Sequence, residues 1–226
     1  MAHKTVRHEH KITEDKFVTR MLLLSEYFQR NWKMVAGTAA GIVIIIIIAL
    51  SLSSHQKAVT KEAVRQFDDV IAAYQAGDLE TAFNEFQRLT SDYSGTREGR
   101  WAYFYLGKIL IEQNPPDYEQ AEEYFQIAYK EIKEDILKEA AFIGVANCQL
   151  AQGNEDKYYD TLKQIVKRFP NSSNAPSLLY EIGEYYWEQE RFEKAKSYYQ
   201  EIVEKYEDAS VYSRAKNRLA EIELFG

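Results

Sequence analysis

Few residues in this chain have the types and spacing that catalysis or metal binding requires. Three of its four histidines, His3, His8 and His10, lie near the start, but no predicted scaffold holds their imidazoles in the geometry of a metal site. Asp68 and Asp69 are adjacent and therefore point to different sides of a helix, so they do not form a carboxylate pair. The sequence also contains no GxSxG, HExxH, GxGxxG or Walker motif. We predict that the protein is not an enzyme and has no catalytic residues, metal or cofactor.

The single cysteine, Cys148, has no partner in the chain for a disulfide, and a cysteine-based zinc site is excluded as well. Cys148 follows Ile143 and Val145 on a predicted helix. We therefore expect a small buried thiol and not a reactive one.

One segment is apolar enough and long enough to cross a membrane. Residues 34–56 contain no Lys, Arg, Asp or Glu, and GTAAGIVIIIIIALSLSS occupies 18 of these positions, from Gly37 to Ser54. A bilayer requires about 20 residues of helix, so we predict a single transmembrane helix over residues 34–54. A cleaved signal peptide is the alternative, because Ala49 and Ser51 are small residues of the kind that a peptidase prefers. No cysteine directly follows the run, which excludes a lipoprotein anchor.

The charges on the two sides of this segment differ. Of the 28 basic and 35 acidic residues, 7 and 4 lie in residues 1–33, which leaves 21 and 31 after it, a net charge of −10. Positive charge is retained in the cytoplasm, and Arg30 and Lys33 border the segment. We predict a cytoplasmic leader over residues 1–33 and an exported domain over residues 55–226. An exported domain this acidic offers no surface for phosphates, so we expect no nucleic-acid partner.

Residues 13–32 of the leader have the pattern of an amphipathic helix. Thr13 is suited to cap it, and Phe17, Met21, Leu24 and Phe28 recur at helical spacing. Next to a membrane, such a helix is either an interfacial anchor or a docking helix for a membrane partner, and amphipathicity does not separate the two.

Gly37 and Gly41 form a GxxxG pair on the predicted transmembrane helix, flanked by Ala36 and Ala40. Small side chains let a second helix approach closely. These residues are candidates for homodimerisation or for packing on another membrane protein, and the alternative is a helix that contacts only lipid.

The rest of the chain repeats a helical hairpin. Ala or Tyr recurs at positions 82, 121, 158 and 195, at spacings of 39, 37 and 37 residues, and a second register places Gly at positions 107, 144 and 183. We expect these glycines to let neighbouring helices approach and each hairpin to bury its apolar face against the next. The expected repeats cover about 60–95, 98–132, 136–170 and 175–207. A capping helix over 209–225 follows, with Arg214 and Arg218 expected among its solvent-facing residues.

At these positions the chain resembles the tetratricopeptide repeat family, whose repeats are pairs of helices. The last repeat matches best, at Leu179, Ile182, Gly183, Tyr186, Ala195 and Tyr199. The resemblance implies an all-α solenoid. Two departures are expected to loosen the packing locally: Val70 stands at a glycine position and Tyr158 at an alanine position.

The resemblance also implies a peptide-binding groove, because fixed positions on the first helix of each repeat line the inner face. In this chain those positions give the predicted groove residues Phe67, Ile71, Tyr74, Trp101, Phe104, Lys108, Ile111, Val145, Tyr180, Glu184 and Trp187. Most are apolar or aromatic, which suits an extended or helical apolar peptide. The alternative is that several are buried between repeats or under a docked segment of the same chain.

The connections at residues 93–99 and 169–176 are similar to those of bacterial envelope repeat proteins. With a short leader, one transmembrane helix and an exported repeat domain, the layout resembles an ancillary subunit of the Sec translocon. This resemblance implies a chaperone-like scaffold at the translocon exit in the inner membrane of a bacterium, with translocon components and exported polypeptides as partners. The alternatives are an envelope scaffold for outer-membrane assembly or for cell-wall and division complexes, and a structural membrane organiser without a client.

Overall fold

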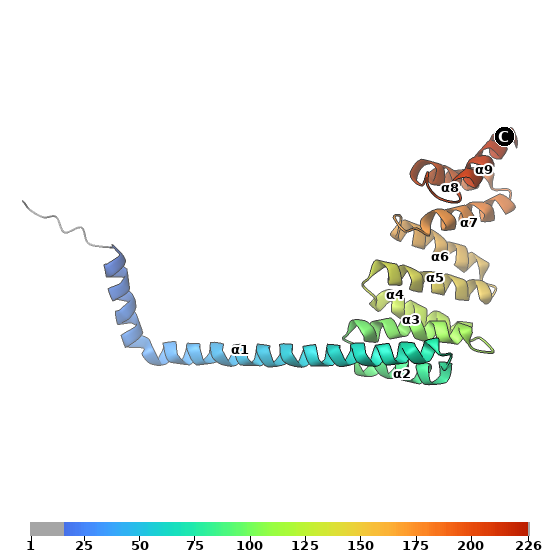
Figure 1. Ribbon diagram of the computed structural model, residues 1–226. Helices are drawn as coiled ribbons and strands as arrows, with labels where there is room; N and C mark the ends of the chain where they lie inside the picture. The colour runs from blue at the N-terminus through green and yellow to red at the C-terminus, as the bar shows by residue number, and fades with distance from the viewer. Residues whose placement is uncertain (1–15, 226) are drawn as a thin grey trace, which may run out of the picture. The chain divides into compact units, whose positions relative to one another are not determined.

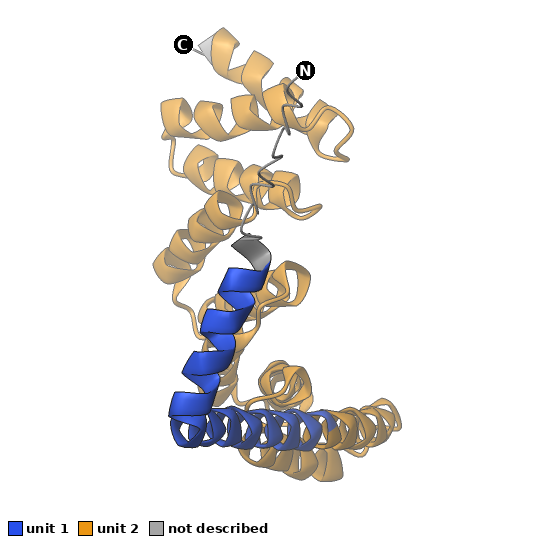
Figure 2. Ribbon diagram, turned by 90° about the vertical axis from the view of Figure 1, so that its left-hand side faces the viewer, with its two compact units in different colours: residues 1–57 blue, residues 58–226 orange. Residues whose placement is uncertain are grey.

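The computed structural model describes residues 16–225, and within this range all regular elements are α-helices. In chain order they are α1 (Lys16–Gln75), α2 (Leu79–Asp92), α3 (Arg97–Glu112), α4 (Tyr118–Glu131), α5 (Asp135–Ala151), α6 (Glu155–Arg168), α7 (Ala175–Glu188), α8 (Phe192–Lys205) and α9 (Tyr212–Phe225) (Figure 1). The predicted all-α fold is confirmed. The leader histidines and Thr13 lie outside the described residues. The chain divides into two compact units, residues 1–57 and 58–226 (Figure 2).

The first unit contains most of α1. The helix is interrupted at Asn31, where φ is −116° and ψ is 21°, and α1 changes direction there (Figure 2). After this point α1 contains the one stretch, among the residues that the structure describes, that is long and apolar enough to cross a membrane. Gly37 and Gly41 are open, because a Cβ added to either would meet no atom within 4 Å.

The second unit stacks helical hairpins (Figure 1). The end of α1 packs on α2, then α3 pairs with α4, α5 with α6 and α7 with α8, and α9 packs on α8. Two of the turns within hairpins place glycine in the left-handed region, Gly77 at φ 83° and Gly153 at φ 77°. Asp78 and Asp117 accept hydrogen bonds from backbone N–H groups in the first turns of α2 and α4, which caps both helices.

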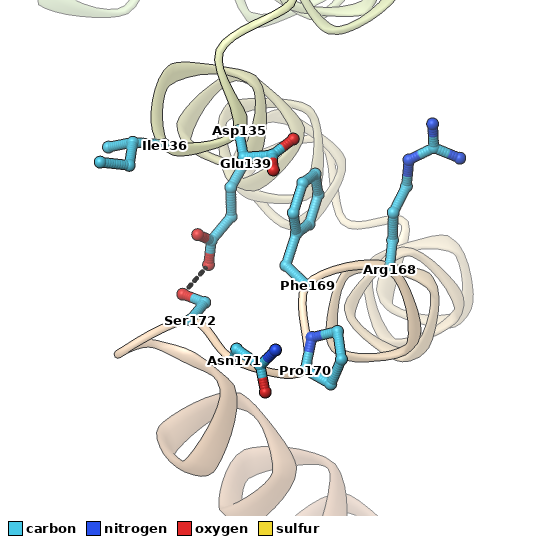
Figure 3. A pocket seen from close by; sticks show the side chains of 8 residues that line it. All are labelled: Asp135, Ile136, Glu139, Arg168, Phe169, Pro170, Asn171 and Ser172. Carbon is cyan, nitrogen blue, oxygen red and sulfur yellow. Dashed lines mark hydrogen bonds between the residues drawn. The ribbon is translucent and has the colours of Figure 1, made fainter.

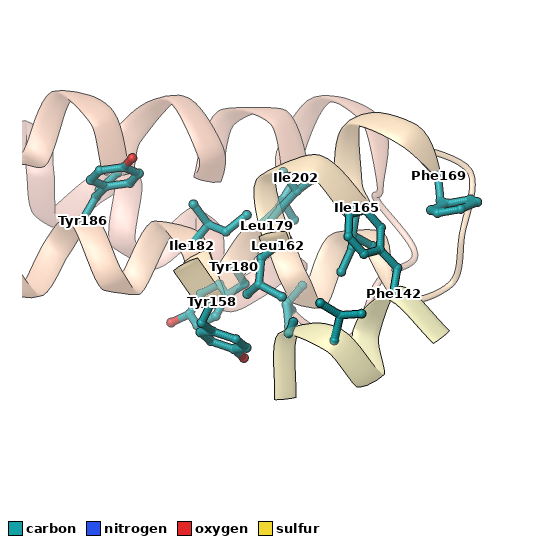
Figure 4. Packing of buried hydrophobic residues seen from close by; sticks show 14 of the residues in the cluster. Phe142, Tyr158, Leu162, Ile165, Phe169, Leu179, Tyr180, Ile182, Tyr186 and Ile202 are labelled. Atoms are coloured by element: carbon teal, nitrogen blue, oxygen red, sulfur yellow. The ribbon is translucent and has the colours of Figure 1, made fainter. Parts of the chain in front are cut away.

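The core lies between successive hairpins. Figure 4 shows the part that α5 to α8 build, which includes Phe142, Tyr158, Leu162, Ile165, Leu179, Ile182 and Ile202. Tyr158, which stands where the family pattern has alanine, is accommodated within this core. Its side chain is buried, and its hydroxyl donates a hydrogen bond to the carboxylate of Glu181 across the α6–α7 boundary. The polar end of the larger side chain is thereby satisfied.

The repeated glycines at positions 107, 144 and 183 lie where the backbone of one helix packs against an aromatic ring of another. A Cβ on Gly107 would lie 2.9 Å from the Phe125 ring, and a Cβ on Gly144 would lie 2.7 Å from the same ring. A Cβ on Gly183 would lie 2.5 Å from the ring of Tyr199. All three distances are shorter than van der Waals contact, so the predicted close approach at these glycines is confirmed.

Candidate peptide-binding surface

Six of the predicted groove residues lie half-buried at the end of α1 and along α3. We name this set the α1–α3 surface, and its members are Ile71, Tyr74, Trp101, Phe104, Lys108 and Ile111. The four residues on α3 recur every three or four positions and therefore share one face of that helix. Phe67, also predicted for the groove, is instead buried and packs edge-on against Trp101 and Phe86.

A polar contact joins α1 to α3 within this surface. The Tyr74 hydroxyl donates to the Glu112 carboxylate, at 2.7 Å from both oxygens. The Lys108 ammonium lies 3.7 Å from one of these oxygens and 5.1 Å from the centre of the Tyr74 ring. Burial raises the pKa of Tyr74, whereas the contacts of Lys108 with Tyr74 and Glu112 outweigh its own burial and raise the lysine pKa. Lys108 is thus a paired cation on an otherwise aromatic and aliphatic surface.

Trp101 is held at both its face and its edge. The Arg97 guanidinium lies 4.6 Å from the ring centroid, and the indole Nε1 donates to Glu134 at 3.2 Å. Phe104 packs edge-on against Tyr105 and Phe125, at centroid distances of 5.6 and 5.7 Å. These contacts fix the orientation of two large rings that remain partly exposed, which lowers the entropy lost when a ligand binds them.

The C-terminal part of the predicted groove is covered by α9. Arg218 donates two hydrogen bonds to Glu184, from Nε at 2.9 Å and Nη2 at 2.8 Å, and its guanidinium lies 4.4 Å from the centre of the Trp187 ring. Arg214 lies 4.3 Å from the centre of the Tyr180 ring, and Tyr180 is buried. The expectation that both arginines face solvent was wrong for Arg218, which is half-buried, whereas Arg214 remains exposed while its guanidinium lies over Tyr180. The reason is that two aromatic faces and a carboxylate on α7 attract the guanidinium groups.

Substitution of Glu184 tests this cover. Burial alone raises the pKa of Glu184, but hydrogen bonds from Arg218 and Tyr199 outweigh it and leave the pKa below its ordinary value of 4.5. The ionised Glu184 carboxylate therefore contributes fully to the free energy of unfolding above about pH 4.5, the ordinary pKa of the group. This contribution is lost as the pH falls through the lowered pKa of the folded state. We expect Glu184→Gln to lower the free energy of unfolding by about 1–2 kcal/mol at pH 7 and to remove this acid-dependent part. Urea unfolding at several pH values measures the loss of stability at pH 7 and its dependence on pH. The control is Glu188→Gln, an exposed change on the same helix.

Val145 is also buried, with 4% of its surface exposed, so the structure brings only part of the predicted set together. Sequence reasoning missed the polar partners Arg97, Glu112 and Glu134. The contact of Glu112 with Lys108 could have been predicted, because Glu112 stands four residues after Lys108 on the same helix, at the spacing of an ion pair. Glu134 lies 33 residues from Trp101, and no local pattern links the two.

A separate hollow of about 270 Å³ lies beside the α6–α7 connection (Figure 3). One polar residue of its lining is engaged internally: Glu139, 6% exposed, accepts hydrogen bonds from Ser172 at 2.5 Å and Asn174 at 3.1 Å. None of the predicted groove residues lines it. These bonds tie the connection to α5 and hold successive hairpins in register.

Within residues 16–225, no three His, Cys, Asp or Glu side chains gather in a way that would hold a metal ion. Cys148 is 1% exposed, and burial raises the pKa of its thiol to about 12. The predicted buried thiol is therefore confirmed.

A family model described as a tetratricopeptide repeat-like domain matches residues 25–213. Two similar solved structures are that of YrrB, described as a TPR protein with an unusual peptide-binding site, and that of PilF from Pseudomonas aeruginosa. YrrB is 15% identical with a TM-score of 0.47, and the match covers 71% of this chain and 82% of YrrB. PilF is 11% identical with a TM-score of 0.42, and the match covers 74% of this chain and 91% of PilF. No curated protein sequence matches the chain.

Proposed function

The chain belongs to the tetratricopeptide repeat-like family, and on this basis we propose that it is a membrane-anchored scaffold that binds polypeptide segments through the α1–α3 surface. The observation that carries the proposal is the half-exposed row of large side chains on this surface, with Trp101 and Phe104 already held in place by their neighbours. Tyrosine and tryptophan anchors of this kind dominate the energy of protein interfaces. The binding is reversible apolar contact, and it uses no ATP.

The apolar stretch of α1 supports the membrane anchor. It is long enough to cross a bilayer, none of it is buried in the structure, and the matched range of the family model includes it. With Arg30 and Lys33 on the cytoplasmic side, the repeat domain is exported, and its net charge of −10 keeps it away from anionic lipid headgroups.

We place this scaffold at the exit of the Sec translocon, where newly exported polypeptides expose apolar segments. Two alternatives use the same parts. In one, the scaffold serves outer-membrane assembly or cell-wall and division complexes. In the other, Gly37 and Gly41 organise membrane partners or a homodimer, and the repeat domain has no client.

Client binding is tested with the full chain in mild detergent and a fluorescently labelled, unfolded secretory precursor as the probe. We expect Trp101→Gln combined with Ile111→Gln to weaken binding about tenfold or more, because both changes remove partly exposed apolar contacts. Ile136→Gln is the matched control, since Ile136 is 87% exposed and lies outside the α1–α3 surface. Thermal unfolding checks that all variants remain folded. Unchanged binding by the double variant would contradict the proposed surface.

Cross-linking separates the three locations. A photo-reactive residue placed within residues 34–52 is expected to attach to the translocon channel. Attachment to envelope assembly or division proteins instead would favour the first alternative. Loss of all membrane complexes after Gly37→Leu and Gly41→Leu, with precursor binding absent in the parent chain, would favour the structural organiser.

A further inference from the structure

The stretch of α1 that precedes Asn31 exposes an apolar face. Met21, Leu24 and Phe28 are 55%, 53% and 48% exposed. We propose that this stretch lies in the cytoplasmic surface of the same membrane, with these three residues among the lipid acyl chains and its arginines at anionic lipid headgroups. The inference rests on the proposed membrane anchor and goes beyond the proposed client binding.

The helical register sorts the side chains into two faces. At 3.6 residues per turn, Met21, Leu24 and Phe28 lie on one face, and Glu26 and Arg30 lie on the opposite one. Leu22 and Leu23 lie at the two edges of that opposite face, so the polar face is narrow. A narrow polar face suits a helix sunk between headgroups, because only the back of such a helix remains in water.

The interruption at Asn31 turns this stretch away from the axis of the apolar segment (Figure 2). The Asn31 side-chain amide donates to the Tyr27 carbonyl oxygen at 3.1 Å, which satisfies an acceptor at the bend. The bend lies three residues before Met34, where the uncharged segment begins. It therefore stands at the expected depth of the headgroups, where a change of direction keeps an apolar helix at the interface.

The charge and the aromatic residues favour lipid as the occupant. Between residues 18 and 33 there are three basic side chains, Arg20, Arg30 and Lys33, and one acidic side chain, Glu26. Tyr27 and Trp32 are 58% and 62% exposed on either side of the bend, and these two residue types concentrate at membrane interfaces. The covalent link to the apolar segment holds the stretch within reach of the same leaflet, where basic residues attract anionic headgroups.

Single-cysteine labelling of the full chain tests the inference, in a background that carries Cys148→Ala. An environment-sensitive dye is attached at position 21, 24 or 28, with positions 19 and 26 as matched controls on the opposite face. Each protein is reconstituted alone into vesicles of phosphatidylcholine with phosphatidylglycerol. Nitroxide-labelled lipids then report which dyes lie in the membrane.

We expect blue-shifted emission and strong nitroxide quenching at positions 21, 24 and 28, and water-like emission at positions 19 and 26. Arg20→Gln with Arg30→Gln is expected to reduce this difference, as is replacing phosphatidylglycerol by phosphatidylcholine. Water-like emission at all five positions would overturn the inference. Protection that occurs only in native membranes would overturn it too, because the occupant would then be a protein.

Two further measurements separate this inference from the proposals on which it rests. Retention of the protein in alkaline-washed vesicles tests the anchor, and binding of the unfolded precursor tests client capture. Loss of retention would overturn the anchor and the interfacial helix together. Retention without periodic quenching would overturn only the interfacial helix, whereas periodic quenching without precursor binding would support it and contradict client capture.

Discussion

Phe125→Ala is expected to lower the free energy of unfolding by about 3–5 kcal/mol, the usual cost of removing a buried phenylalanine ring. Phe125 is 2% exposed, and its ring fills the space between Gly107 on α3 and Gly144 on α5. Both helices pack along their length on α4, so they are not expected to collapse into the cavity. Urea unfolding of the full chain in mild detergent, followed by far-ultraviolet circular dichroism, measures the loss.

A double-mutant cycle makes this prediction specific to the contact. Gly107→Ala alone is expected to be destabilising, because its Cβ would lie 2.9 Å from the Phe125 ring. In the Phe125→Ala background the same change meets no ring and is expected to cost less or to stabilise the helix. Equal effects of Gly107→Ala in both backgrounds would show that the glycine does not serve to admit the ring.

The packing around Phe125 could be predicted from the sequence because the pattern of residues that produces it recurs in several repeats. Glycines at a fixed spacing, with an aromatic residue after a small one, predict rings packed against helix backbones, and the structure places Phe125 and Tyr199 in that way. The burial of Tyr158 could not be predicted in the same way. Its burial depends on Glu181, 23 residues later on another helix, and nothing in the repeat pattern indicates that partner.

The predicted groove shows the limit of what helical register alone can predict. Helical spacing assigns residues to a common face, but it does not say what covers that face. Tyr180 and Trp187 share the pattern of Trp101 and Phe104, yet Arg214 and Arg218 of α9 cover them. The bend at Asn31 had no sequence signal either, because neither Gly nor Pro stands within the predicted leader helix.

Gly99→Ala is expected to cost about 3 kcal/mol, at the upper end for added volume in a packed site, although a single methyl group is added. The new Cβ would lie 2.1 Å from the carbonyl oxygen of Tyr93 and 3.0 Å from that of Leu89. Both neighbours are backbone atoms, so no change of rotamer relieves the overlap, and the corner between α2 and α3 must open. Opening also strains the hydrogen bond from the Gly99 N–H to the Thr96 hydroxyl, 3.0 Å long, which caps α3.

Gly95→Ala, four residues earlier in the same connection, is the matched control, because a Cβ there would meet no atom within 4 Å. Its expected effect on the free energy of unfolding is within about 0.5 kcal/mol. Urea unfolding of the two variants in parallel therefore isolates the overlap from the general preference for glycine in connections. Similar losses of unfolding free energy for both variants would mean that the connection between α2 and α3 opens at little cost. The close approach at Gly99 would then contribute little to the packing of α2 on α3. A large loss for Gly99→Ala alone would identify that approach as what sets the angle between the first two hairpins, and with it the spacing of Tyr74 and Lys108 on the α1–α3 surface.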